Sequence, residues 1–525
     1  MKLIRGGTVI DGTGAAAFRA DVVIDGDRIA DVVAGGVAGG DFEETLDAAG
    51  CLVTPGFIDA HTHSDAYLVL EPDAPSKISQ GITTEINGQC GGSVAPRFGE
   101  ARLSSDWAAL LGERLTWRTL AEYRAVLAAA RPAVNTVQFV GHNTLRSSVV
   151  GYAGRAATPD ELRRMTRLLE EALDDGGWGL TTGLIYQPGK YSTPEEVVTL
   201  AKAAAAKGGF YATHMRSEGD RILEAIDEVV ELVKATGIRA EISHLKTSGA
   251  RNWGKIDAVL EKIETAMGQG LLLGSDRYPY CAAGTDLDVV FPDWAGEGGA
   301  PAELKRLEDA GLRARIVDEI NAADRDWSEV MIGGTWAEEN KPFSGKTVAE
   351  ILAAGSNRRQ STAGELITSI LLADGCKTGA FFFGMSEENL AKIYSRPWIV
   401  PGSDASLRAP WGPLGADHPH PRAYATMPEF YRRVRALGFS REETVARMSS
   451  VVAERFGLRD RGRLRAGCFA DVAVWDESRF RAKATFLSPH QFTEGVAFVM
   501  VNGTVPYRDG RFTGDRGGRF LERGA

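Results

Sequence analysis

Side chains that bind metal ions recur along this chain, and each of them stands at or just after the end of an apolar run. His61 and His63 follow the run GFIDA, and Cys90 lies in the segment INGQCGG. The remaining members of the set end FYATH, RAEISH and WIVPGSD; they are His214, His244 and Asp404. The chain has only 8 histidines, and four of them belong to this set. Imidazole, thiolate and carboxylate groups in this number predict a metal site.

Each of these residues also has an ordinary explanation when it is taken alone. A His-x-His pair on a strand places both rings on one face, because side chains alternate, but the bare motif is a weak signal. Cys90 could be a small buried filler, which is the usual role of a free cysteine. His214 and His244 could be hydrogen-bonded core histidines. Their occurrence together, in order along successive runs, favours the metal site.

Four further histidines lie outside this set. His142 ends the run VQFVGH, and we expect it either to support a metal ligand or to contact the substrate. The other three, His418, His420 and His490, lie in proline-rich segments, and we interpret them as ordinary loop residues.

The elements that must position these side chains alternate between strand and helix patterns. The predicted strands are GFIDAHTH, TTEING, NTVQFVGHN, WGLTTGLIY, FYATHMR, RAEISHLK, LLLGSDRYPY and WIVPGSDAS. Between them lie helical patterns, two of which begin at the predicted N-caps Thr158 and Thr193. Eight such units predict an α/β fold, a TIM-like (β/α)8 barrel with a parallel sheet. The carboxyl ends of the strands build the active site in such barrels, and the metal-binding residue types stand there.

The domain organisation is predicted from where the pattern of apolar runs and turn residues changes along the chain. We expect residues 57–457 to form the barrel, with an insertion at about 285–390 that could cover the site; a separate domain is the alternative. The two ends, 1–56 and 458–525, carry short β patterns and turn pairs such as Asp25-Gly26 and Asn502-Gly503. We expect both ends to form one composite β-sandwich domain, with two separate hairpin caps as the alternative.

Composition narrows the classes of partner. The 525 residues carry a net charge of −10, which argues against a nucleic-acid binder because such proteins need basic surface. Five scattered cysteines argue against a disulfide framework and are typical of a protein in a reducing compartment. The first residues lack the apolar core of a signal peptide, and no run is long enough for a membrane span. We therefore expect a cytoplasmic protein without a membrane partner; its oligomeric state stays open.

Nine segments give the chain a resemblance to the N-acyl-D-amino-acid deacylases (D-aminoacylases) of the amidohydrolase superfamily. They are PGFIDAHTHSD, GITTEINGQCGGSVAP, VGHNTLR, GLTTGLIYQPG, YATHMRSEG, ISHLKTSG, VPGSDAS, HPRAYATMPEF and RGRLRAGCFADVAVWD, and they span nearly the whole chain. The cysteine of NGQCG is the sharpest mark, because many superfamily members use a carboxylated lysine after the fourth strand instead. Here that strand reads TTGLIYQ, and Lys190 is several residues beyond it.

The resemblance implies a ligand set and a reaction. It implies a tightly bound Zn²⁺ on Cys90, His214 and His244. It also implies a second, weaker position framed by His61, His63 and Asp404, although the number of ions stays open. The reaction would be hydrolysis of the amide bond of a small-molecule N-acyl-D-amino acid by a metal-activated water. Asp404 would serve as general base and then general acid.

The product carries an α-carboxylate, which requires cationic partners. Lys246 lies two residues after His244 on the same strand face, and Arg408 lies four residues after Asp404. The resemblance adds a tyrosine after the seventh strand, Tyr278, with Tyr280 as the alternative. Tyr186 and His142 are lesser candidates for substrate contacts. Residues 281–294 contain three Asp and no Lys or Arg, which favours a neutral or apolar substrate side chain.

Two other functions compete with this one. A cyclic-amide hydrolase of the dihydroorotase or hydantoinase type is disfavoured by the missing bridging lysine. A non-catalytic barrel scaffold is disfavoured because all six ligand positions hold competent residues.

Overall fold

Eight parallel strands follow one another in chain order at the centre of the protein. The computed structural model describes residues 1–525 except 37–39, 104, 356–360 and 524–525. The strands are β6 (Phe57–Asp59), β7 (Ile82–Asn87), β8 (Asn135–Gln138), β10 (Gly179–Gly183), β11 (Phe210–His214), β12 (Arg239–Ile242), β13 (Leu273–Arg277) and β17 (Ile399–Pro401). The short β9 (Val140–Gly141) continues the line of β8. One sheet has the order β6-β7-β8 and the other the order β17-β13-β12-β11-β10-β9.

The last of these strands meets the first. The amide of Ala60 donates to the carbonyl of Pro401 at 3.1 Å, and the amide of Asp404 donates to the carbonyl of His61 at 2.8 Å. The segments after β6 and β17 thus lie side by side, and a parallel bridge joins Thr62 to Ala405. This order is the one predicted from the sequence, and it brings the carboxyl ends of distant strands together.

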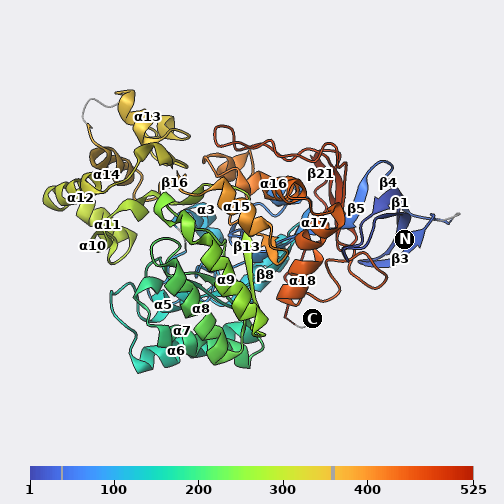
Figure 1. The fold of residues 1–525 in the computed structure, drawn as a ribbon, viewed down its shortest axis with the longest axis horizontal. Helices are drawn as coiled ribbons and strands as arrows, with labels where there is room; N and C mark the ends of the chain where they lie inside the picture. Colours follow the sequence, from blue (N-terminus) through green and yellow to red (C-terminus); the bar gives the residue numbers. More distant parts are fainter. Residues whose placement is uncertain (37–39, 104, 356–360, 524–525) are drawn as a thin grey trace.

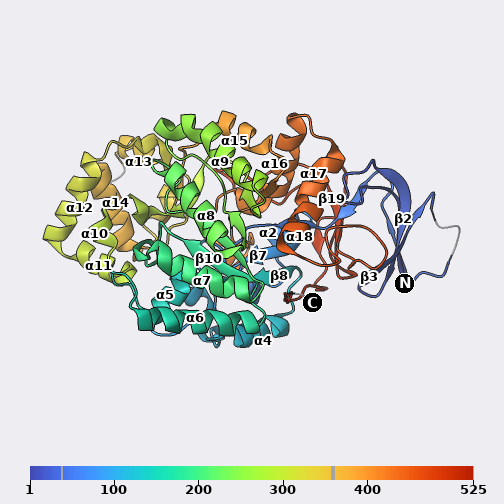
Figure 2. The ribbon, with the colours of Figure 1, turned by 60° about the horizontal axis from the view of Figure 1, so that its bottom comes forward.

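Helices cover the outer side of these strands (Figures 1 and 2). The two predicted N-caps are confirmed: the hydroxyls of Thr158 and Thr193 accept from the amides of Glu161 and Glu196. The helix after Thr158 buries Met165 and Leu169 against the strands. The helices between β6 and β17, outside the insertion, are α1 (Tyr67–Leu70), α2 (Pro75–Ile78), α3 (Ser105–Leu111), α4 (Leu120–Ala130), α5 (His142–Val149), α6 (Pro159–Asp174), α7 (Pro194–Ala206), α8 (Ile222–Thr236), α9 (Ile256–Gly268) and α15 (Glu387–Tyr394). After β17 come α16 (Arg422–Ala436), α17 (Arg441–Met448) and α18 (Ser450–Phe456). No helix in the described part of the chain is both long and apolar enough to cross a bilayer.

A buried lysine ties the carboxyl ends of the first two strands to the last. Lys77 Nζ donates to Asp59 Oδ2 at 3.0 Å and to Ser403 Oγ at 2.9 Å, and it lies 3.2 Å from Glu85 Oε1. All four side chains are buried. The charge of Lys77 therefore has its compensation inside the protein, close to the strand ends that carry the site.

Strands from both ends of the chain share one nine-stranded sheet, on one side of the central strands (Figure 1). Its order is β21-β20-β19-β18-β5-β1-β2-β3, with β4 paired to β1. The N-terminal strands are β1 (Lys2–Val9), β2 (Phe18–Asp25), β3 (Arg28–Ala34), β4 (Glu44–Asp47) and β5 (Leu52–Pro55), and the C-terminal ones are β18 (Val472–Trp475), β19 (Val496–Val501), β20 (Thr504–Arg508) and β21 (Arg511–Phe512). The turn pairs Asp25-Gly26 and Asn502-Gly503 connect successive antiparallel strands, as predicted.

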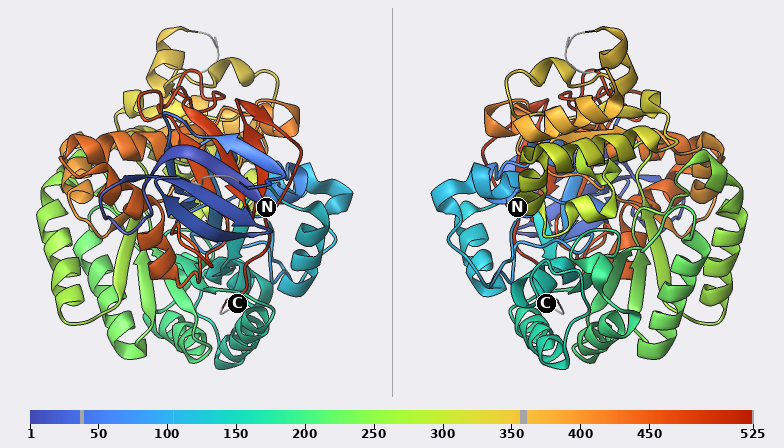
Figure 3. Two further views of the ribbon diagram at one scale, coloured as in Figure 1. Left: turned by 90° about the vertical axis from the view of Figure 1, so that its right-hand side faces the viewer. Right: turned by 90° about the vertical axis from the view of Figure 1, so that its left-hand side faces the viewer.

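A long segment between β13 and β17 has its own antiparallel sheet and its own apolar core. The sheet has the order β14 (Ala283–Asp286), β16 (Gly379–Phe382), β15 (Val330–Ile332), and the sequence analysis did not foresee it. Its helices are α10 (Asp293–Gly296), α11 (Ala300–Glu308), α12 (Ala310–Ala322), α13 (Val348–Ala353) and α14 (Ala363–Ala373). Ile316, Ile320, Leu366 and Ile370 belong to the core of this segment. The segment lies on the side of the molecule opposite the nine-stranded sheet (Figure 3).

Candidate active site

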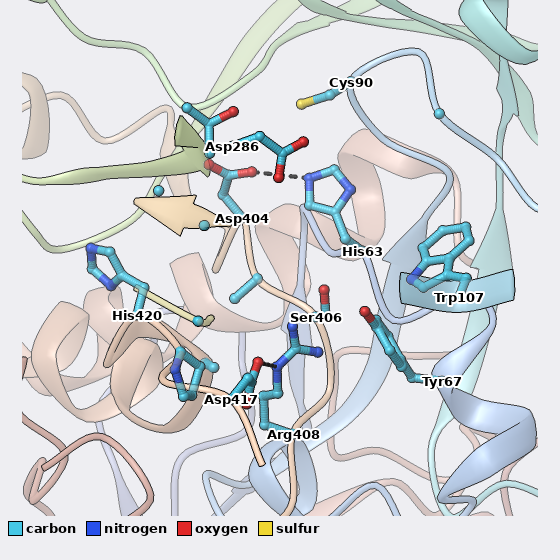
Figure 4. A pocket seen from close by; sticks show the side chains of 18 of the residues that line it. His63, Tyr67, Cys90, Trp107, Asp286, Asp404, Ser406, Arg408, Asp417 and His420 are labelled. Atoms are coloured by element: carbon cyan, nitrogen blue, oxygen red, sulfur yellow. Dashed lines mark hydrogen bonds and ion pairs between the residues drawn. The ribbon is translucent and has the colours of Figure 1, made fainter. Parts of the chain in front are cut away.

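The six residues singled out by type and position converge at the carboxyl ends of the strands. They form two overlapping groups, one of His61, His63, Cys90 and Asp404 and one of Cys90, His214 and His244. Within each group the donor atoms all lie within 4.8 Å of one another. Cys90 belongs to both groups, and Figure 4 shows it near His63 and Asp404.

The Cys90 thiol is surrounded by three imidazole nitrogens. Its Sγ lies 3.3 Å from His61 Nε2, 3.3 Å from His244 Nε2 and 3.8 Å from His214 Nδ1. Burial alone would raise the pKa of Cys90, but the positive charges of His61 and His244 lower it well below its usual value. Burial lowers the pKa of His214, which keeps that ring neutral. A sulfur and three imidazole nitrogens at these distances are the donor types of a zinc site.

Outer carboxylates hold two of these rings. Asp276 Oδ2 lies 3.3 Å from His61 Nδ1, and Asp276 Oδ1 accepts from the amide of His244 at 3.0 Å. Glu218 Oε1 lies 3.0 Å from His244 Nδ1. Carboxylates on the far nitrogen of a histidine fix the tautomer and the ring orientation of a metal ligand. Asp276 was not predicted, although its position at the end of LLLGSD was a usable signal.

The backbone at three of the six clustered positions is in the left-handed region. Cys90 has a φ of 52°, His244 of 38° and Asp404 of 48°. Non-glycine residues in this region cost about 1–3 kcal/mol each and persist where the surroundings fix them. Here the surroundings are the hydrogen bonds of the Asp404 and His244 amides described above and, at Cys90, Gly183, where even an added Cβ would lie 2.1 Å from the Cys90 carbonyl oxygen.

Asp404 is held as an anion between two histidines and an arginine. Its Oδ1 lies 3.0 Å from His63 Nε2 and 3.4 Å from His61 Nε2, and its Oδ2 lies 2.8 Å from the Arg422 guanidinium. Burial would raise the pKa of Asp404, but the charges of Arg422 and His244 bring it well below its usual value. Arg422, the first residue of α16, was missed by the sequence analysis because it lies 18 residues after Asp404 in a proline-rich segment without a periodic pattern.

A cavity of about 450 Å³ opens above the metal-type residues. Its lining includes Tyr186 and Arg408, two of the residues predicted to contact substrate. It also includes residues of the insertion such as Asp286 and Phe381. Arg408 Nε donates to Asp417 Oδ2 at 2.8 Å. The insertion therefore contributes a wall of the cavity rather than lying apart from it.

Three other predicted substrate contacts are buried away from this cavity. Lys246 is buried, donates to Glu218 and lies 2.7 Å from His244 Nδ1. Tyr278 is fully buried, with the Arg422 guanidinium 4.6 Å from its ring centre. His142 Nε2 lies 2.8 Å from Glu196 Oε1. None of the three is among the described residues that line this cavity or its neighbour.

Two of the proline-rich histidines do more than the sequence analysis foresaw. His418 and His420 lie in a loop, as predicted, but both line the cavity. His420 is buried, and its Nε2 lies 3.0 Å from the carbonyl oxygen of Ala282. Burial and the neighbouring Arg422 lower the pKa of His420 well below its usual value, so this ring is neutral. A loop that folds back over the strand ends leaves no periodic trace in the sequence.

Comparison with known proteins gives full-length matches. The model of the amidohydrolase family matches residues 44–507. A D-aminoacylase of Alcaligenes xylosoxydans xylosoxydans is 35% identical over 100% of this chain and 98% of its own length. An N-acyl-D-glutamate deacylase of the same organism is 34% identical over 100% of this chain and 96% of its own. A solved structure of N-acyl-D-glutamate deacylase from Bordetella bronchiseptica, with zinc and a phosphonate mimic of the tetrahedral intermediate, has a TM-score of 0.82. It is 32% identical and covers 99% of both chains.

Proposed function

This chain belongs to the amidohydrolase family, and we propose on that premise that it hydrolyses the amide bond of N-acyl-D-amino acids, giving a carboxylate and a free D-amino acid. The observation that carries the proposal is the Cys90 thiol among three imidazole nitrogens, with the Asp404 carboxylate beside it. The preference for D-amino acids rests on similarity to deacylases whose names specify it.

Zn²⁺ is the proposed cofactor, with Cys90, His214 and His244 as its principal ligands and His61, His63 and Asp404 at a second, weaker position. The donor atoms of Cys90, His214 and His244 support this, because they all lie within 4.8 Å of one another and can reach one ion. A zinc ion acts as a Lewis acid that polarises an amide carbonyl and makes a water molecule more acidic.

Asp404 is the proposed proton carrier. The contacts with His63 and Arg422 keep the Asp404 carboxylate ionised, so that it is free to accept a proton from the attacking water and to pass it to the leaving nitrogen. Both transfers are needed, because the amine must be protonated to leave. The contact with Arg422 fixes one oxygen and leaves the other turned toward the histidine rings.

The substrate α-carboxylate requires cations, and Arg408 is the proposed partner that lines the cavity. Lys246 and Tyr278 belong to the proposed set through their place after β12 and β13, and a movement of Glu218 would have to release Lys246. Tyr186 lines the cavity next to His214 and is the proposed contact for the acyl carbon. His142 acts by orienting Glu196 rather than by touching substrate. A neutral or apolar side chain is proposed for the D-amino acid.

The chemistry of the cyclic-amide hydrolases needs a bridging carboxylated lysine, which this chain does not offer. Lys190 Nζ donates to Asp293 Oδ1 at 2.8 Å, so its ammonium is directed to the insertion. We propose no second function.

The same proposal extends to the architecture. The meeting of β17 with β6 supports one closed (β/α)8 barrel over 57–457, and the shared sheet supports a composite domain of 1–56 with 458–525. The insertion at about 285–390 belongs to the barrel domain. A cytoplasmic location is proposed from the cysteine content.

One experiment tests the proposed reaction. The purified chain is analysed for zinc and assayed with N-acetyl-D- and N-acetyl-L-amino acids, dihydroorotate and hydantoin. We expect bound zinc and turnover of the N-acetyl-D-amino acids only. A metal-free and inactive protein, or turnover restricted to the cyclic amides, would overturn the proposal.

A further inference from the structure

A second cavity, of about 430 Å³, adjoins the proposed metal centre on the side of the insertion. It shares Cys90, Tyr186 and Asp286 with the first cavity. From there it extends between the loop after β10 and the N-terminal part of α11. Figure 4 shows Asp286 on the same side of the pocket as Cys90 and Asp404. The proposed function leaves this second cavity without a role.

The wall of the second cavity carries more acidic than basic side chains. Four carboxyl groups line it, from Asp286, Asp288, Asp293 and Glu303, against the two basic groups of Arg102 and Lys190. Lys190 is paired with Asp293 at 2.8 Å, and the Arg102 guanidinium lies over the ring of Tyr152 at 5.4 Å. Within the described ranges, no basic side chain lies within 4.0 Å of a carboxylate oxygen of Asp288 or Glu303.

Glu303 is the residue that points to a ligand. Its side chain is only 3% exposed, and no hydrogen-bond donor in the described part of the chain reaches its Oε1. Burial and the adjacent Asp288 raise the pKa of Glu303 to about 9, and burial raises the pKa of Asp288 to about 6. The carboxyl groups of Glu303 and Asp288 therefore share a proton at neutral pH. A cation larger than a proton could take that place between them. With that proton shared, Glu303 Oε1 is still buried without a donor from the described residues, and such an atom costs stability unless a bound group donates to it.

We propose that this second cavity binds an ammonium group carried by the acyl half of the substrate, with Glu303, Asp288 and Asp286 as its acceptors. This inference rests on the proposed function, which assigns the α-carboxylate to Arg408 in the first cavity. The scissile bond lies at the junction near Cys90, so the acyl half extends in the other direction, into the second cavity. An organic cation fits better than a metal ion, because the described metal-type groups both contain Cys90 and neither contains Asp288 or Glu303.

Matched substrates test the inference on the zinc-loaded full chain. N-(6-aminohexanoyl)-D-leucine is compared with N-heptanoyl-D-leucine, which has a methyl group in place of the ammonium. We expect the cationic substrate to have a kcat/KM about tenfold higher, because hydrogen bonds to charged groups are the strong ones. Glu303→Gln should reduce the ratio of the two kcat/KM values to near one, mainly through KM of the cationic substrate. Glu308→Gln, at an exposed position of the same helix, is the matched control and should keep the ratio.

The outcomes separate this inference from the proposed function. Hydrolysis of both substrates with equal kcat/KM would overturn the subsite and leave the proposed function standing. Failure to hydrolyse N-acetyl-D-leucine would overturn the proposed function itself. A preference for N-acetyl-D-lysine over N-acetyl-D-norleucine, without a preference for the aminoacyl substrate, would overturn the assignment to the acyl half. Should Glu303→Gln fail to fold, competitive inhibition of the wild type by pentylamine but not by pentanol supports the subsite, and equal inhibition by both overturns it.

Discussion

Gly183, at the end of β10, lets the loop that carries Cys90 pass directly over the strand. A methyl group added at Gly183 would lie 2.1 Å from the carbonyl oxygen of Cys90 and 2.9 Å from Tyr186 Cδ2. Real Cβ atoms essentially never come closer than 3.0 Å to such atoms. The backbone of Gly183 is not in the left-handed region, so an alanine there meets this contact without any strain of its own.

The size of the effect follows from that distance. Relief from 2.1 to 3.0 Å requires the Cys90 carbonyl to move by about 1 Å, since the obstacle is backbone and cannot rotate away. A misplacement of about 1 Å at a catalytic centre can lower the rate by about 100-fold. Overpacking costs about 1–3 kcal/mol of stability, which a protein of this size tolerates. We therefore expect Gly183→Ala to fold, to bind zinc more weakly and to lose about 100-fold in kcat.

The assay combines zinc analysis at fixed free zinc, kcat with N-acetyl-D-leucine, and thermal unfolding. Gly268→Ala is the matched control, because nothing lies within 4 Å of its added methyl group and its φ is ordinary. A folded Gly183→Ala protein with the zinc content and kcat of the wild type would show that close packing behind Cys90 does not position the thiolate.

Three further outcomes are expected. Cys90→Ala should purify with little zinc and no turnover. The control Cys51→Ala, which alters a half-buried thiol beside the nine-stranded sheet, should keep both zinc and turnover. Metal analysis decides between these outcomes, and full zinc in Cys90→Ala would refute the ligand assignment. Asp404→Asn should retain zinc while kcat falls by about 10²–10⁴-fold, because an amide cannot accept the proton; stopped-assay kinetics measure this, and an unchanged kcat would remove Asp404 from proton transfer. Lys77→Met leaves two carboxylates buried without their cation and should lower the free energy of unfolding by about 3–5 kcal/mol. In urea unfolding Lys207→Met should cost less than about 1 kcal/mol, since its pair with Asp174 is on the surface; equal losses would contradict the argument.

The order of elements was readable because strands and helices have different periods. The run FYATH became β11, the predicted strand RAEISHLK became β12 over Arg239–Ile242, and Thr158 and Thr193 capped helices where the sequence indicated. The metal-type residues were found for the same reason. The local sequence shows that these residues stand at the ends of strands, and parallel packing of the strands then brings those ends together.

Contacts between segments that lack a periodic pattern could not be predicted. Arg422 reaches Asp404, and His420 enters the cavity wall, from a loop whose path depends on its proline residues and on what it packs against. Lys246 lies close to His244, but β12 ends at Ile242 and His244 has a left-handed φ of 38°, so the predicted shared strand face is not the reason. The partner of Lys246, Glu218, comes from the loop after β11. Pairing of this kind depends on tertiary distance, which spacing within one strand does not encode.

The shared nine-stranded sheet cannot be completed until the ribosome has synthesised the C-terminal end of the chain. The hydroxyl of Thr54 in β5 donates to the carbonyl of Ala473 in β18 across 419 residues of chain. Gly56 alone separates β5 from β6, the strand that leads to His61 and His63. The N-terminal strands therefore emerge long before β18–β21 exist, and β5 presents an unpaired edge throughout that time. Closing so long a loop costs only about 0.6 kcal/mol per doubling of its length, so the delay is one of time rather than of free energy. A nascent chain stopped before β18 would expose the unpaired edge of β5 directly before β6, His61 and His63, and proteases and chaperones could recognise that edge.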